Sequence, residues 1–168
     1  MLPDPLHPAV VHFPIVLMAF LPLAALGGLW AVRRGASPLR GWALPAAMAG
    51  LLTLSAWAAL QTGQSQEERA EDVVGEQRIE THEESAERFL LLSGIVFVVS
   101  AAGLARGAPG RVARGVATVA TLGLLVAGYQ VGHTGGTLVY GDGVSPGISQ
   151  LSGAGSEGGE DHRDRDRD

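Results

Sequence analysis

The sequence contains no cysteine and no lysine among its 168 residues. Without thiols the chain has no disulfide framework, no thiolate metal site, no iron–sulfur cluster and no covalently attached c-type haem. Without lysine it has no phosphate-binding loop of the glycine-rich, lysine-containing kind. Charged residues make up only 17% of the chain, and the net charge is −5 with no basic patch. We therefore expect no nucleic-acid partner.

Four long stretches of the chain lack Asp, Glu and Arg altogether. They hold 28, 26, 17 and 27 residues and lie between residues 4 and 33, 40 and 67, 88 and 106, and 114 and 142. A helix needs about 20 mostly apolar residues to cross the hydrocarbon core of a bilayer, and the third stretch reaches this length once residues 86–88 are included. None shows the polar stripe of a soluble helix. We therefore predict an all-α, up-down bundle of four transmembrane helices at about 11–32, 42–61, 86–105 and 115–131.

The remaining charges predict the orientation of the bundle. Residues 33–40 and 106–114 connect the first helix to the second and the third to the fourth, and their only charges are arginines. The middle connection, 62–85, is acidic. The positive-inside rule places the arginine loops in the cytoplasm, so the acidic loop and both termini lie on the outer, periplasmic side of a bacterial cytoplasmic (inner) membrane. We assign residues 1–144 to the transmembrane domain and 145–168, rich in Gly, Ser, Asp and Arg, to a disordered tail.

Four histidines fall at the outer edge of the predicted bundle: His7, His12, His82 and His133. Imidazole is the commonest neutral metal ligand, and it also binds haem iron axially. Two cofactor interpretations follow, a b-type haem held by histidines from two helices and a zinc or copper site built from three or four of these imidazoles. The third interpretation has no cofactor, the histidines being ordinary interfacial residues.

A row of glycines marks one face of the fourth helix. Gly128, Gly132 and Gly136 recur every four residues and therefore share a face. Such a face accepts a second helix or the flat ring of a haem. The spacing alone favours helix packing.

A haem at this edge would need two axial ligands and partners for its propionates. We predict His12 and His82 as the axial pair, because they come from different helices. Nearby carboxylates, Glu83, Glu84 and Glu87, would orient the ring of His82. The reserve ligands are His7 and His133. Arg78 or Arg88 would pair with the propionates.

Two segments carry a resemblance to a known family. Leu6-His-Pro-Ala-Val-Val-His-Phe-Pro-Ile opens the chain, and Gly132-His-Thr-Gly-Gly-Thr-Leu-Val-Tyr-Gly-Asp-Gly-Val closes its folded part. With Thr62-Gly63 and His82 they resemble, over roughly residues 2–145, the bacterial integral membrane family known as domain of unknown function 2231. The resemblance implies a small multi-pass membrane protein, and it favours haem because members look like small membrane cytochromes. The positions that match the family's pattern are His7, His12, His82, Gly135, Gly136 and Tyr140.

We therefore predict a redox carrier or a membrane subunit rather than a stand-alone enzyme. The first hypothesis is a b-type haem protein that exchanges single electrons with a partner protein at the outer face. The second is a cofactor-free subunit or scaffold of a larger membrane complex, and the third is a zinc or copper site in metal handling. The lipid bilayer is a partner in all three.

Overall fold

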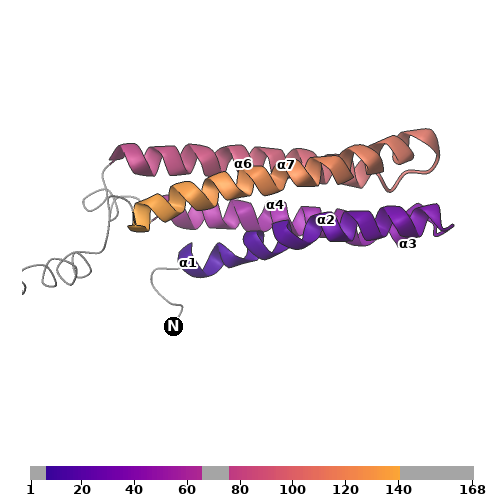
Figure 1. The fold of residues 1–168 in the computed structure, drawn as a ribbon, viewed down its shortest axis with the longest axis horizontal. Helices are drawn as coiled ribbons and strands as arrows, with labels where there is room; N and C mark the ends of the chain where they lie inside the picture. Colours follow the sequence, from indigo (N-terminus) through magenta and orange to yellow (C-terminus); the bar gives the residue numbers. More distant parts are fainter. Residues whose placement is uncertain (1–6, 66–75, 141–168) are drawn as a thin grey trace, which may run out of the picture.

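Four long helices run side by side and form the body of the molecule (Figure 1). A computed structural model describes residues 7–65 and 76–140. The long helices are α2 (His12–Arg33), α4 (Ala43–Gln64), α6 (Glu76–Ala102) and α7 (Gly107–Tyr140), and the short helices α1 (His7–Val10) and α3 (Pro38–Gly41) precede α2 and α4. Each long helix is long and apolar enough to cross a membrane. The predicted all-α bundle of four membrane-spanning helices is confirmed.

The helices extend beyond the predicted spans, most of all in the second half of the chain. α6 begins at Glu76 instead of residue 86, and α7 runs from Gly107 to Tyr140 instead of from 115 to 131. Residues 62–64 and 76–85 of the predicted acidic connection are thus helical. Glutamate and glutamine are good helix formers in water, so a helix continues past the point where its apolar stretch ends. The predicted tail, 145–168, lies outside the described residues.

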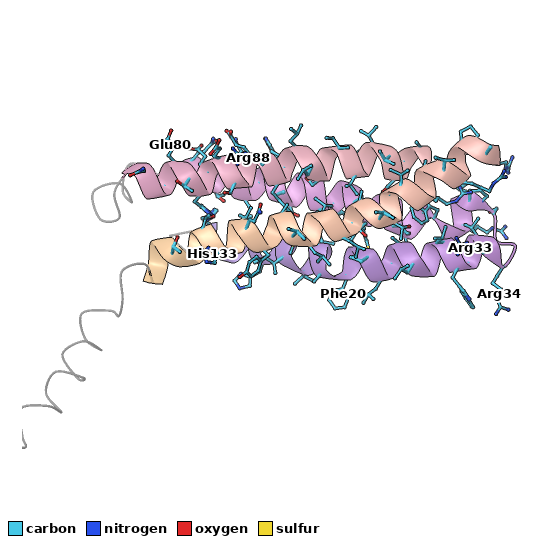
Figure 2. The ribbon with its side chains drawn as sticks, turned by 45° about the horizontal axis from the view of Figure 1, so that its top comes forward. Phe20, Arg33, Arg34, Glu80, Arg88 and His133 are labelled. Atoms are coloured by element: carbon cyan, nitrogen blue, oxygen red, sulfur yellow. The ribbon has the colours of Figure 1, made fainter. Side chains whose placement is uncertain are left out.

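The bundle closes as a ring, with α2 packed on α4, α4 on α6, α6 on α7 and α7 on α2. Each long helix contributes one large buried aliphatic side chain to this core: Leu21, Leu52, Val96 and Leu124. Alanines fill much of the remaining interface, which lets the helices approach closely. Large apolar side chains instead point outward, as Phe20 does with 57% of its surface exposed (Figure 2). An inside-small, outside-large pattern suits a bundle surrounded by lipid.

A glycine turn ends α2 and directs the chain into α3. Gly35 has a φ of 101°, a conformation that side-chain-bearing residues rarely adopt. The Ala36 N–H donates to the Ala31 carbonyl and the Gly35 N–H to the Val32 carbonyl, both at 3.1 Å. These two bonds form a Schellman motif, which satisfies the last carbonyls of α2. Pro38 then starts α3 with its fixed φ.

The two ends of the bundle carry different polar residues. The arginine end contains the connections from α2 to α4 and from α6 to α7, with Arg33, Arg34, Arg40, Arg106, Arg111 and Arg114. The histidine end is the opposite one, where α1, the start of α2, the end of α4, the start of α6 and the end of α7 bring His7, His12, His82 and His133. Figure 2 shows Arg33 and Arg34 at one end and Glu80 and His133 toward the other.

Candidate functional site

His7 connects the beginning of the chain to the end of α4. Its half-buried ring places Nδ1 2.9 Å from the Ala59 carbonyl oxygen and 3.3 Å from Thr62 Oγ1. The Thr62 hydroxyl donates its own proton to carbonyls of α4, at 3.1 Å to Ala58 and 2.9 Å to Ala59. A carbonyl only accepts, so Nδ1 of His7 carries the proton and donates it. This leaves Nε2 as the nitrogen that can offer a lone pair.

His82 makes the corresponding contact between α6 and α7. Its Nδ1 lies 3.0 Å from Thr134 Oγ1. The Thr134 hydroxyl donates to the Val131 carbonyl at 3.0 Å, so its oxygen is the acceptor for His82. Nδ1 of His82 therefore carries the proton as well, and Nε2 keeps its lone pair. In metal proteins this arrangement, with one ring nitrogen donating and the other bare, fixes a histidine for coordination.

A glycine lies beneath each of these rings. A Cβ at Gly63 would stand 3.2 Å from Cε1 of His7, and a Cβ at Gly135 would stand 3.0 Å from Cε1 of His82. Both distances are tighter than ordinary van der Waals contact, so each ring can take its position only because the residue next to it is a glycine without a side chain. Gly135, which the family resemblance marks, thus seats the imidazole of His82.

The two contacts repeat one pattern, which the sequence analysis missed. In the first helical hairpin His7 packs on Thr62-Gly63, and in the second His82 packs on Thr134-Gly135. The chain separations from histidine to threonine are 55 and 52 residues. The signal that could have revealed these threonines is therefore a histidine followed, some fifty residues later, by Thr-Gly, twice in the chain.

The repetition brings the two imidazoles together. The ring centroids of His7 and His82 are 6.4 Å apart, and the ring planes are nearly perpendicular, at 86°. With about 2.0–2.1 Å from nitrogen to metal, two rings that share one ion have centroids roughly 5 to 6.4 Å apart, and the separation grows with the angle at the metal. The pair lies at the upper end of that range. The structure thus brings His7, and not the predicted His12, beside His82.

The other two histidines are exposed and lie apart from this pair. His12 donates from Nδ1 to the Pro8 carbonyl at 2.7 Å, a contact within its own segment of chain. His133 lies beside Tyr129, with ring centroids 6.1 Å apart. In residues 7–65 and 76–140, no group of three or more His, Asp and Glu side chains is placed to hold a metal ion. The predicted site of three or four imidazoles is therefore not formed there, because His12 and His133 face away from the bundle interior.

Two of the three carboxylates predicted to orient His82, Glu83 and Glu84, have other partners. Glu83 accepts a hydrogen bond from Gln64 at 2.6 Å, which joins α6 to α4. Glu84 forms an ion pair with Arg88 one turn later, at 2.5 Å, and both side chains are exposed. Arg78 lies in α6 and Tyr140 ends α7, but their side chains are outside the described residues. A threonine hydroxyl, and no carboxylate, orients the ring of His82.

The predicted glycine face of α7 is divided. At Gly128 an added Cβ would collide with the Met18 side chain and meet Phe89, so this glycine accommodates a neighbouring helix. At Gly132 and Gly136 nothing lies within 4 Å of that position. Gly128 thus takes part in helix packing, as its spacing favoured. The face does not continue as one flat surface toward His82.

A family model described as "Predicted membrane protein (DUF2231)" matches residues 3–146. The match includes all four long helices and both histidine contacts. No curated protein and no solved structure shows significant similarity to the chain. The chain is therefore a member of the DUF2231 family of membrane proteins.

Proposed function

We propose that this multi-pass membrane protein holds a transition-metal centre between His7 and His82 and uses it in single-electron transfer. The observation that carries the proposal is the pair itself. Two imidazoles from different helices stand 6.4 Å apart, and each has its Nδ1 proton donated to a neighbouring helix. Nε2 of each ring is then a bare nitrogen donor. Such a pair would supply two nitrogen ligands to a b-type haem iron, or to a zinc or copper ion.

The space around the rings separates these two forms of the centre. A hollow of about 210 Å³ borders Thr134, the partner of His82, and is otherwise lined by Gln77, Thr81 and Thr137, so neither imidazole lines it. Small-molecule sites usually measure about 300–1,000 Å³. A bare ion needs no such volume, whereas a porphyrin is larger than this hollow. The donor set fits haem iron, but the described packing does not provide the slot for its ring.

Within the proposed centre, the chain's own residues hold and orient the ligands. The Ala59 carbonyl and the Thr134 hydroxyl accept hydrogen bonds from the Nδ1 N–H groups and so fix the tautomer of each ring. Gly63 and Gly135 allow the rings to lie close to the helix backbones. Bound iron or copper would supply one-electron chemistry at this end of the bundle. The electron partner would dock there, against the end of α7 and the start of α6.

The test is a spectrum and a metal analysis on one sample. Protein purified in detergent from haem-replete, metal-supplemented cells is scanned oxidised and then after dithionite. A Soret band with sharp reduced bands identifies haem, and stoichiometric copper identifies a redox-active ion. Stoichiometric zinc, which has no redox chemistry, would overturn the electron-transfer role and assign the pair to metal handling. His7→Ala and His82→Ala should each abolish the signal, whereas the matched control His133→Ala should retain it. A colourless wild-type protein without stoichiometric metal would overturn the proposal.

A cofactor-free scaffold is the second candidate, and the same contacts favour it. His7 and His82 each tie two helices together through Nδ1 without any metal. In that case His82→Ala removes one hydrogen bond, which lowers the free energy of unfolding by about 1 kcal/mol and so lowers the melting temperature. The variant changes no cofactor content. Retention of partner proteins in a purified complex would then be the property to follow.

The orientation in the membrane is part of the proposal. We infer that the arginine end faces the cytoplasm of a bacterial inner membrane and that both termini lie outside, because the charges of the short connections at the arginine end are all arginines. The absence of native cysteine makes single-cysteine labelling direct. Ser65→Cys should react with an impermeant maleimide in intact spheroplasts, and Ser37→Cys only after lysis. The reverse labelling pattern would refute the orientation.

A further inference from the structure

A cavity opens at the arginine end, far from the paired histidines. Its volume is about 350 Å³, and it lies between the end of α2 and the beginning of α7. The lining residues are Leu29, Val32, Arg33, Gly107, Arg111, Arg114 and Gly115. Its size falls within the range of small-molecule sites, about 300–1,000 Å³. The metal centre proposed above makes no use of it.

The positive charge of this cavity has no carboxylate to balance it. Three of the seven lining residues are arginines. The sequence has no Asp or Glu from residue 5 to 66 or from 88 to 141, which includes every residue of both connections at this end. Three guanidinium groups around one cavity repel each other unless an anion lies among them. The absence of a nearby carboxylate therefore favours an anion at this cavity.

Arg114 brings one of these charges into the protein interior. Only 2% of its surface is exposed, and its Nη1 donates to the Gly103 carbonyl and, at 3.2 Å, to the Ala105 carbonyl. These bonds cap the end of α6 but leave the charge without a counter-ion. A buried charge is costly unless it is paired. Because the same side chain lines the cavity, an anion there would meet this need.

The start of α7 adds a second electrostatic contribution. α7 begins at Gly107, whose φ of 81° turns the chain into the helix, and its first turn holds no acidic residue. The N-terminus of a helix carries partial positive charge from its free N–H groups, and cations there are unfavourable. Arg111 and Arg114 nevertheless lie in the first two turns. An anion in the cavity would offset the repulsion between these arginines and the partial positive charge of the helix N-terminus.

We propose that this cavity binds a phosphate group, supplied by the head of an anionic phospholipid. Guanidinium groups form paired hydrogen bonds with phosphate oxygens. The lipid source is favoured because Leu29 and Val32 are apolar lining residues. Val112 and Val116, which follow the lining residues Arg111 and Gly115 in the chain, are 65% and 52% exposed. An acyl chain can follow that surface away from the head group. Basic pockets between membrane helices hold lipid head groups in this way.

The test measures which lipid stays with the protein. The full chain is reconstituted in nanodiscs of phosphatidylcholine in which phosphatidylglycerol is diluted about tenfold, so that a preference for the anionic lipid is visible. Bound lipid is counted by native mass spectrometry after gentle detergent release. Arg111→Gln and Arg33→Gln should each lower retention of phosphatidylglycerol about fivefold, the effect of one arginine near a lipid surface. Arg34→Gln and Arg40→Gln are matched controls, since they lie at the same end but do not line the cavity.

Three results would overturn the proposal. One is equal retention by the lining variants and the controls. Another is equal retention of phosphatidylcholine and phosphatidylglycerol by the wild-type protein. The third is displacement of phosphatidylglycerol by millimolar inorganic phosphate, which would assign the cavity to a soluble anion. Arg114→Gln is left out because loss of its bonds to α6 could unfold the corner, and circular dichroism of Arg111→Gln confirms that the tested variant is folded.

Discussion

The two ends of the bundle are both held by side chains that donate to a neighbouring helix, but the donors differ in chemistry. At the histidine end, His7 and His82 donate through Nδ1 and keep a second nitrogen with a lone pair. At the arginine end, the Trp42 indole donates to the Ser100 carbonyl at 2.9 Å, and Arg114 donates to Gly103. Neither of those groups has an acceptor to offer.

This difference shows how one bundle offers two kinds of site. The imidazoles fasten their helices with one nitrogen and can donate a lone pair to a cation with the other. Indole and guanidinium fasten theirs with N–H groups alone, so any further partner must accept hydrogen bonds or carry negative charge. The histidine end is therefore suited to a metal, and the arginine end to an anion.

The largest expected loss of stability is at the arginine end. Trp42 is completely buried, with Ala25, Ala46 and Ala117 packed around it. Trp42→Ala should lower the free energy of unfolding by about 3–5 kcal/mol, because it leaves a cavity and removes the bond to Ser100. Thermal unfolding in detergent, followed by circular dichroism, measures the change. Trp57→Ala, at a lipid-facing indole, should leave the melting temperature nearly unchanged, and an equal loss in the two variants would refute the packing role.

The next effect tests how the histidine half of the bundle packs. Gly128→Val should push the Met18 side chain, and with it α2, away from α7, at a cost of about 1–3 kcal/mol in unfolding free energy. Gly132→Val, one turn on, meets nothing within 4 Å and should cost far less. Chemical unfolding of both variants gives the comparison. If Gly132→Val were the more damaging, the open part of the face would be covered by something other than lipid.

A finer test concerns the acceptor of His82 and depends on the proposed metal centre. Thr134→Val removes the oxygen that receives the Nδ1 proton. Metal affinity should fall about 10–100-fold, the usual loss when a ligand's orienting partner is removed. Thr137→Val, whose hydroxyl donates to the Thr134 carbonyl, is the matched control. Metal titration measures both, and unchanged affinity in Thr134→Val would separate the hydrogen bond from any ligand role.

The smallest effect belongs to the ion pair between Glu84 and Arg88. The two side chains are 59% and 69% exposed, one helical turn apart. Arg88→Gln should change the unfolding free energy by no more than about 0.5 kcal/mol, and the change should vanish in high salt. Unfolding at low and at high salt measures it. A larger, salt-independent loss would mean that Arg88 holds a group other than Glu84.

Particular residues show how far sequence reasoning reaches. The charge-free stretches predicted four helices, because a charge inside a bilayer is costly and the gaps between charges reach the span of a helix. The apolar pattern did not give the positions of the helix ends at Glu76 and Tyr140, since helix propensity continues in water after that pattern stops. The glycine row predicted helix packing at Gly128 but gave no sign that Gly63 would seat a ring.

The sequence by itself determined the number of helices, the apolar surface and the grouping of histidines at one end and arginines at the other. These follow from composition along the chain, which fixes what each segment can bury. Only the tertiary structure decided that His7 meets His82 while His12 turns outward, and that three arginines surround one cavity. Such pairings depend on the rotation of each helix about its axis, and side-chain packing across the bundle sets that rotation.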